Sequence, residues 1–165
     1  YNHPAYISAL ETSIVRFLES SAWTPDIILA SFHGIPKSYA DNGDPYPDHC
    51  RETVRLLATC PGLKDVDLRL SFQSRVGRAE WLRPYTDETI AEFAANGTRN
   101  LAVITPGFSS DCIETLEEIA MEGAEIFREN GGENYTAIPC LNDHPDSISM
   151  ISRIVREELS GWLDG

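Results

Sequence analysis

The sequence predicts an α/β domain with a four-stranded parallel sheet flanked by helices. Short apolar runs alternate along the chain with longer segments whose apolar residues recur at helical spacing. Strands that alternate with helices in this way are joined by right-handed crossovers into a parallel sheet. The length, 165 residues, suits a single domain with its own core, and a hydrophobic fraction of 42% is ordinary for a globular protein.

The first helix is predicted at residues 4–20, where Ile7, Leu10, Ile14 and Leu18 share one face. The first strand follows at 26–31 as a continuous apolar run, which is typical of a strand buried on both faces. Residues 36–47 are rich in Gly, Pro, Asp and Asn and predict a loop. The next helix is expected at 48–59.

A second strand is predicted at 66–71, where Asp67 and Arg69 alternate with apolar residues. An irregular loop at 73–84 carries Trp81. A helix is then expected at 86–96, with Thr86 as its N-cap and Gly97 just beyond its C-terminus.

The third strand is predicted at 100–105 and is followed by a long helix at 110–130, which two glycines close. The fourth strand is predicted at 134–140 and the last helix at 146–162. We expect the inner face of this helix to consist of Ile148, Ile151, Ile154, Val155 and Leu159.

The charge is strongly negative, with 13 Lys and Arg against 26 Asp and Glu and a formal net charge of −13. Nucleic-acid binding needs a basic face, so this class of function is excluded, and an anionic membrane surface is disfavoured for the same reason. The acidity indicates either simple solubility or attraction of cations, including metal ions. No apolar stretch reaches the ~18 residues of a membrane span.

The four cysteines form no Cys-x-x-Cys pair, so no zinc or thioredoxin-like motif is present. Few cysteines and an N-terminus without the features of a secretory signal predict a cytoplasmic protein with reduced thiols. The chain lacks an initiating Met, and we expect it to be a piece of a longer or processed protein. No glycine-rich nucleotide motif and no Gly-x-Ser-x-Gly elbow follows a strand.

Candidate functional residues follow two predicted strands. His33 lies at the end of the first, and Asp111 and Glu114 lie beyond the third. Because ligands bind at the carboxyl ends of parallel strands, we expect the function to lie between them. An imidazole can take up a proton near neutral pH, although a strand-end histidine can also be satisfied by loop backbone alone.

An acidic ridge is predicted on the helix that carries Glu114. Glu118 and Glu122 follow at four-residue steps, and each step of four drifts only about 40° around an α-helix. A solvated face is one interpretation, and the abundance of other glutamates on the helix favours it. The other is a path for hydrated divalent cations, which prefer oxygen ligands. Trp81 could cover a flat apolar ligand or fill the domain's own core.

Several ordered segments resemble the ferrochelatase family: Ser-Phe-His-Gly-Ile-Pro at 31–36, Gly-Asp-Pro-Tyr-Pro at 43–47, Phe-Gln-Ser-Arg at 72–75 with Trp-Leu-x-Pro at 81–84, and Pro-Gly-Phe-Ser-Ser-Asp-x-Ile-Glu-Thr-Leu at 106–116. The match covers nearly the whole chain and corresponds to the family's C-terminal half. The resemblance implies a Rossmann-like, chelatase-type domain over residues 1–165, with the N-terminal half absent. It also implies a lyase that inserts Fe²⁺ into protoporphyrin IX, the last step of haem biosynthesis.

The resemblance also implies roles for individual residues. His33 matches the family's active-site histidine, as proton acceptor or metal ligand, and Glu114 matches its carboxylate partner. Glu118 and Glu122 fall on the family's acidic metal-handling helix, which is partly a π-helix. The substrate-binding residues implied in the same way are Tyr46, Ser74, Trp81 and Asp111.

The sequence departs from the family pattern at Cys112, where some members have His. No cysteines cluster near residues 161–165, so we expect no iron–sulfur cluster and no tightly bound cofactor, with Fe²⁺ as a substrate. The expected partners are protoporphyrin IX, ferrous iron and the missing N-terminal half, through which a peripheral membrane contact is left open. That half would supply the opposite wall of the cleft, so we expect the isolated chain to fold but to turn over poorly or not at all.

Three alternatives remain open at this point. The first is a chelatase for another tetrapyrrole, of the coproporphyrin or the sirohydrochlorin and cobalt type. The second is a metal- or tetrapyrrole-binding module without catalysis. The third is a purely structural α/β domain, which would leave the joint occurrence of His33 and the Glu114 ridge at strand ends as coincidence.

Overall fold

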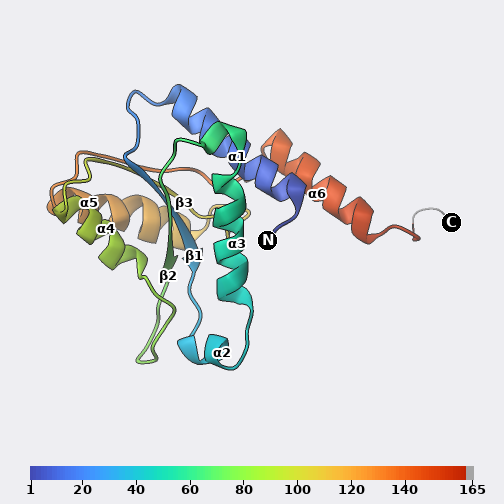
Figure 1. Cartoon of the computed structure of the whole chain (residues 1–165), viewed down its shortest axis with the longest axis horizontal. Coiled ribbons are helices and arrows are strands. Elements are labelled where there is room, and N and C mark those ends of the chain that lie inside the picture. Colours follow the sequence, from blue (N-terminus) through green and yellow to red (C-terminus); the bar gives the residue numbers. More distant parts are fainter. Residues whose placement is uncertain (163–165) are drawn as a thin grey trace.

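A four-stranded parallel sheet with strand order β2-β1-β3-β4 forms the centre of the molecule (Figure 1). The computed structural model describes residues 1–162; the last three residues of the domain expected over 1–165 lie outside the described part. The strands are β1 (Ile27–His33), β2 (Leu68–Gln73), β3 (Asn100–Ile104) and β4 (Asn134–Ala137). The predicted fold class is confirmed.

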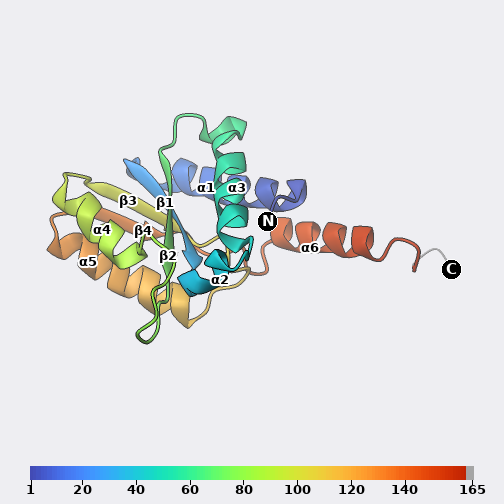
Figure 2. The same cartoon turned by 60° about the horizontal axis from the view of Figure 1, so that its bottom comes forward.

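Helices cover both faces of the sheet (Figure 2). They are α1 (Pro4–Ser20), α2 (Lys37–Asp41), α3 (Tyr46–Ala58), α4 (Thr86–Ala95), α5 (Gly123–Glu129) and α6 (Pro145–Glu158), with a 3₁₀ turn η1 (Pro61–Leu63) and a π-helix η2 (Glu114–Glu122). Among residues 1–162, no helix combines the length and the apolar character that crossing a membrane requires.

Alternating residues of the inner strands face two separate hydrophobic clusters. Ile28, Ala30 and Phe32 of β1 belong to the cluster that includes residues of α1 and α3. Leu29 faces the other side, where α4, η2 and α5 supply Ile90, Ile119 and Phe127. Period-two alternation along β1 continues to His33, so its side chain lies on the same side as η2.

The first two strands end later than predicted. Both were expected to stop at position 31 or 71, but β1 runs to His33 and β2 to Gln73, and these two residues pair in the parallel register. Each strand therefore delivers a polar side chain while it is still part of the ladder. The fourth strand is shorter than predicted and ends at Ala137.

The loop predicted at 36–47 contains a short helix, α2, which an i,i+4 ion pair between Lys37 and Asp41 supports with an N–O distance of 2.6 Å. The N-cap of α4 is Tyr85, not Thr86. The Thr86 hydroxyl lies in the core instead, 2.8 Å from the hydroxyls of both Ser31 and Ser71. A buried hydroxyl satisfied by other side chains is not free to cap a helix.

The helix predicted at 110–130 begins only at Glu114, and its first nine residues form the π-helix η2 before α5 continues it. The resemblance to ferrochelatase implied such a segment, whereas the helical periodicity alone did not. The i→i+5 bonding of a π-helix holds more than four residues in a turn, so residues four apart lie nearly one above another. Glu114, Glu118 and Glu122 therefore keep the ridge arrangement.

The predicted inner face of the last helix was wrong. Ile148, Ile151, Val155 and Leu159 are 54%, 44%, 46% and 40% exposed. The residues that face the body are Ser147, Met150 and, in part, Ile154, because α6 packs mainly against α1 and extends beyond the sheet (Figure 1). The helix also ends at Glu158, earlier than the predicted residue 162.

Candidate active site

His33 lies at the carboxyl end of β1, and one of its two ring nitrogens is hydrogen-bonded to the backbone. Its Nδ1 is 2.7 Å from the carbonyl oxygen of Gly34. Because a carbonyl only accepts hydrogen bonds, Nδ1 carries the proton in the neutral ring and Nε2 presents a free lone pair. The Tyr46 hydroxyl donates to the backbone carbonyl of His33 at 2.8 Å, which fixes the end of the strand.

An open pocket of about 480 Å³ brings most of the predicted site residues together. Its walls come from the end of β1, the loop after β2, and η2 with the residue before it. The lining residues are His33, Ser74, Arg75, Val76, Trp81, Ile113, Glu114, Glu117, Glu118 and Glu122. Two of the predicted substrate-binding residues, Tyr46 and Asp111, are not among them.

Two aromatic rings lie near the imidazole. The Trp81 ring centroid lies 6.4 Å from that of His33, and the Phe108 centroid lies 6.2 Å from it. Gly34 permits the close approach of Trp81, since a Cβ there would stand 3.2 Å from the indole Cε3. Phe108 was not singled out from the sequence, although its position after Pro-Gly at the end of β3 is a signal that could have found it.

The carboxylate of Glu114 is held ionised. A hydrogen bond with the Cys112 side chain lowers the pKa of Glu114, and a hydrogen bond with its own backbone and the nearby His33 add to the effect. Cys112, which stands where some family members have His, therefore still supports the charge of this carboxylate.

Glu118 is bound to the end of β2 rather than left free in the pocket. Its carboxylate accepts from the Ser74 backbone N–H at 2.7 Å and from the Ser74 hydroxyl at 2.5 Å. Ser74 has a φ of +64°, a left-handed conformation that is uncommon for residues other than glycine. The bonds to Glu118 therefore hold the start of the loop that carries Trp81.

A buried chain of polar side chains ties the π-helix to the sheet, and no sequence motif indicated it. Gln73 is 3% exposed; its Oε1 accepts from the Ser31 hydroxyl at 2.8 Å. Its Nε2 donates to the backbone carbonyl of Glu114 at 2.9 Å. The hydroxyl of Thr86 extends the chain to Ser71. Because these groups are buried and paired, they fix where η2 begins relative to His33.

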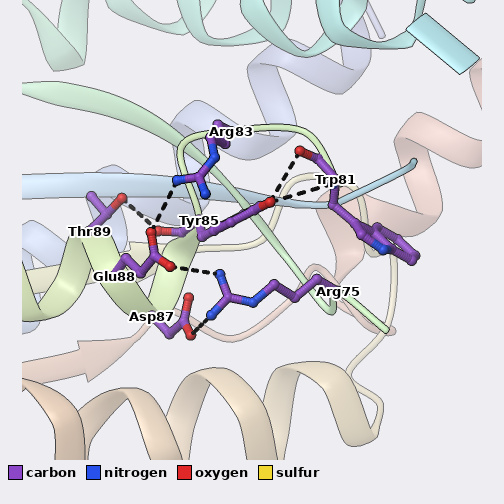
Figure 3. Close-up of polar contacts among 7 residues, drawn as sticks. All are labelled: Arg75, Trp81, Arg83, Tyr85, Asp87, Glu88 and Thr89. Carbon is purple, nitrogen blue, oxygen red and sulfur yellow. Dashed lines mark hydrogen bonds and ion pairs between the residues drawn. The ribbon is translucent and has the colours of Figure 1, made fainter. Parts of the chain in front are cut away.

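The loop after β2 is fastened by the stacked side chains in Figure 3. The guanidinium groups of Arg75 and Arg83 lie on opposite sides of the Tyr85 ring, 4.1 and 4.2 Å from its centroid. Both pair with Glu88, and Arg75 also pairs with Asp87 at 2.6 Å. The two ends of the loop are thereby joined.

Within residues 1–162, no three His, Cys, Asp or Glu side chains converge closely enough to bind one metal ion together. The four residues predicted as metal ligands line one pocket but are spread along it. Glu118 is held by Ser74, and Glu122 lies eight residues along the helix from Glu114. Metal handling by His33 and the three glutamates stays a prediction.

Asp111 was predicted to bind substrate, but both oxygens of its carboxylate accept hydrogen bonds from within the protein. One oxygen accepts from the Thr115 hydroxyl at 3.1 Å and the Cys140 backbone N–H at 3.3 Å, and the other accepts from Asn142 Nδ2 at 2.7 Å. The Asn142 side chain in turn accepts from the Asp111 backbone N–H at 2.8 Å. These bonds clamp the segment that leads into η2 to the loop before α6.

Replacing Asp111 with Asn should remove part of the acid sensitivity of folding. Burial opposes ionisation of Asp111, but the hydrogen bonds from Asn142, Cys140 and Thr115 outweigh it, so its pKa lies below the usual 3.8. A carboxyl group whose pKa is lower in the folded than in the unfolded protein stabilises the fold at pH values above its unfolded pKa. This stability is lost as the pH falls through its pKa in the folded protein. We expect D111N to be less stable at pH 7 and to show a flatter acid limb in chemical denaturation. An unchanged acid limb would contradict this assignment.

Replacing Gly123 with Ala should destabilise the protein, although alanine usually favours a helix over glycine by about 0.5–1 kcal/mol. Gly123 begins α5 where the π-helix ends, and a Cβ there would collide with the Tyr135 hydroxyl, which donates to the Ile119 carbonyl at 2.6 Å. Overpacking of this kind costs about 1–3 kcal/mol. Denaturant unfolding measures the loss. The substitution should cost less in a Tyr135→Phe background, and equal costs in both backgrounds would refute the collision.

The ferrochelatase family model matches residues 1–159 of this chain. Among curated proteins, the ferrochelatase of Nitrobacter hamburgensis is 54% identical over 163 residues, covering 99% of this chain and 47% of the relative. The ferrochelatase of Brucella anthropi is 54% identical over 160 residues, covering 97% and 46%. The chain therefore spans about half the length of the curated relatives it matches.

A solved structure, SirB from Bacillus subtilis with Fe3+, superimposes with a TM-score of 0.60. The alignment covers 90% of this chain and 53% of SirB at 11% identity, so this likeness concerns the fold. The fold, the order of the motifs along the chain and the match over residues 1–159 agree with one another. The chain belongs to the ferrochelatase family and corresponds to the C-terminal half of its members.

Proposed function

We propose that the full-length protein inserts Fe²⁺ into protoporphyrin IX to form haem, and that this chain supplies the wall of the site that accepts protons and handles the metal. One observation carries the proposal. His33, with Nε2 free to accept a proton, shares an open pocket with Trp81 and the carboxylates of η2. The family supports the reaction class, and the geometry of this pocket supports the proposed roles.

Porphyrin metallation releases two pyrrole N–H protons as the metal binds. Nε2 of His33 is a neutral base on this wall, and it can accept one proton while Nδ1–H stays bonded to Gly34. The ionised Glu114 stabilises the imidazolium that results. In this proposal the imidazole is a proton acceptor, with metal ligation as the alternative role.

The carboxylates along η2 serve the metal substrate. Oxygen ligands suit a hydrated divalent ion, and a row of them can replace part of its water without trapping it. Glu122 and Glu117 are exposed at the pocket, and Glu114 lies beside the imidazole. We therefore propose that Fe²⁺ passes along this ridge toward His33, or that the ridge removes the second proton.

The apolar part of the pocket would hold the macrocycle. Trp81, Val76 and Ile113 line the pocket, and Val76 and Ile113 are 74% and 66% exposed. The ring centroids of Trp81 and of nearby Phe108 lie 6.4 and 6.2 Å from that of His33. A porphyrin is flat and apolar at its centre but carries acidic propionates. This half, with its net charge of −13, offers them little attraction, so we propose that the other half binds them.

The proposal requires no tightly bound cofactor and no iron–sulfur cluster, and iron enters it only as a substrate. It places the enzyme in the cytoplasm, in keeping with four cysteines that are all free thiols in the described residues. Activity is assigned to the full-length protein, since this chain spans 46–47% of its curated relatives.

The test is metal insertion by the full-length protein, followed by absorbance, with Zn²⁺ in air and Fe²⁺ without oxygen. Protoporphyrin, coproporphyrin and sirohydrochlorin are offered separately and in competition. We expect protoporphyrin to be metallated fastest, and Glu114→Gln to slow insertion while porphyrin still binds. Preferred metallation of either other tetrapyrrole would replace the proposed substrate. Tight porphyrin binding with no turnover would favour a binding module.

A further inference from the structure

We propose that Tyr135 is a positioning residue that keeps η2 wound as a π-helix and so keeps Glu114 and Glu122 in one row. Tyr135 belongs to β4, an edge strand, and does not line the pocket. It acts through the helix that carries the acidic ridge. The winding role is independent of the reaction, whereas its consequence for metal insertion rests on the proposed function.

The junction between η2 and α5 leaves one backbone carbonyl without a partner in the helix. The Gly123 N–H bonds to the Glu118 carbonyl, five residues earlier, and this bond closes the last turn of η2. Beyond Gly123 the helix continues as α5, in which N–H groups bond four residues back. The change from five-residue to four-residue bonding passes over the carbonyl of Ile119.

Tyr135 supplies the missing donor. Its hydroxyl donates to the Ile119 carbonyl at 2.6 Å. Ile119 is 1% exposed, so water has little access to this carbonyl, and a buried carbonyl without a donor is unfavourable. Burial raises the pKa of Tyr135, so its phenol stays protonated and remains a donor.

The packing of its ring directs the hydroxyl to this carbonyl. Tyr135 pairs with Leu101 in the ladder between β3 and β4. Its ring centroid lies 5.9 Å from that of Phe127, which is fully buried in α5. Gly123 leaves room for the phenol, since a Cβ there would collide with the phenol oxygen. The strand, the ring contact and the glycine therefore place one hydroxyl against one carbonyl.

The winding of η2 decides how its glutamates line up. Gln73 fixes the start of the helix, because its Nε2 donates to the Glu114 carbonyl at 2.9 Å. An α-helix turns by about 100° per residue, and a π-helix turns by less because its turn holds more than four residues. Rewinding η2 as an α-helix would return the Ile119 carbonyl to the Gly123 N–H and turn Glu122 by roughly 80° relative to Glu114. By satisfying that carbonyl from outside the helix, Tyr135 favours the π-wound form.

The experiment compares amide hydrogen exchange, peptide by peptide, in the full-length protein and its Tyr135→Phe variant, which keeps the ring and loses only the hydroxyl. We expect exchange over residues 114–124 to become about tenfold faster, the order expected when a buried carbonyl loses its donor. Tyr6→Phe is the matched control, because the Tyr6 hydroxyl donates to the Pro106 carbonyl at 2.7 Å, and it should leave exchange in η2 unchanged. Gly123→Ala, which displaces the Tyr135 hydroxyl from the other side, should also speed exchange there.

Zn²⁺ insertion into protoporphyrin tests the consequence for the site, at a temperature where the variant is folded. We expect kcat of Tyr135→Phe to fall about tenfold, because misplaced groups slow the reaction even when they are present. The KM for porphyrin should stay within about twofold, since the apolar wall of the pocket is untouched. A residue that only stabilised the fold would change neither quantity in the folded protein.

Unchanged exchange over residues 114–124 in Tyr135→Phe would overturn the proposal. Faster exchange spread over the whole protein, or shared by Tyr6→Phe, would overturn it as well. Faster exchange confined to η2 together with an unchanged kcat would contradict the positioning role. If the wild-type protein inserts no metal into any tetrapyrrole, the proposed function fails, and the exchange result by itself decides whether Tyr135 holds the winding.

Discussion

Replacing His33 with alanine in the full-length protein should lower the rate of Zn²⁺ insertion into protoporphyrin by about 10²–10⁴-fold, the usual contribution of a positioned proton acceptor. The Nδ1–H bond to Gly34 leaves Nε2 as the only basic atom of this ring. Alanine removes that atom and leaves the pocket otherwise intact. Porphyrin affinity should change little, since Trp81 and the apolar wall remain.

His49→Ala is the matched control. His49 stacks on Tyr1 with ring centroids 3.7 Å apart, and it is not part of the pocket. Its replacement should leave the insertion rate within a factor of about two, as for a surface substitution of small effect. Porphyrin affinity is measured by fluorescence quenching beside the rate. A His33→Ala protein that turns over normally would contradict the assignment of His33, whereas loss of porphyrin binding would give it a binding role.

The positions of the strands and of His33 could be predicted because they depend on local pattern. The run from Ile27 to Phe32 is apolar at every position except Ser31, and a run of that kind is typical of a strand in a parallel sheet. Gly34 and Pro36, which follow, indicate where the strand ends. The edge of the sheet that carries the site then follows from topology alone.

The π-helix and the partners of Asp111 could not be read from periodicity. Apolar spacing cannot distinguish i→i+4 from i→i+5 bonding over nine residues, so only the family resemblance implied η2. Asp111 has the residue type of a substrate ligand, but Asn142, 31 positions away, takes up its carboxylate. Sequence pattern does not report a contact over that separation.

The faces of α6 show a different limit. The pattern at Ile148, Ile151 and Val155 correctly indicated an amphipathic helix. It could not indicate what covers the apolar face, because periodicity is the same whether the covering surface is the domain's own sheet or another part of the polypeptide. The exposure of Ile148, Ile151 and Val155 is therefore something that the structure shows and the sequence pattern could not supply.

Replacing Glu118 with alanine should lower stability by about 2 kcal/mol, since a hydrogen bond to a charged group contributes about 1.5–3 kcal/mol and Glu118 is only partly buried. Two such bonds, from the backbone and the hydroxyl of Ser74, join η2 to the end of β2. Without them, Ser74 has less to offset its φ of +64°, and the loop that carries Trp81 loses one of its attachments. Others remain, among them the Arg75–Tyr85 stack and the backbone hydrogen bond from Leu82 to Ile35.

The melting temperature of the full-length protein, which is about twice as long as this chain, should fall by about 3 °C for a loss of that size. Glu117→Ala is the matched control, because Glu117 is exposed on the same helix and its side chain makes no hydrogen bond or ion pair within residues 1–162. A double-mutant cycle with Ser74→Ala separates the interaction between Glu118 and Ser74 from the effect of removing the charge of Glu118. A coupling free energy of about 1 kcal/mol is expected for groups in direct contact. If Glu118→Ala and Glu117→Ala shift the melting temperature equally, Glu118 is part of a solvated acidic face and does not hold the loop. A large shift with strong coupling to Ser74 would show that Glu118, the middle glutamate of the ridge, has a structural role. Glu114 and Glu122 would then be the ridge carboxylates available to the metal.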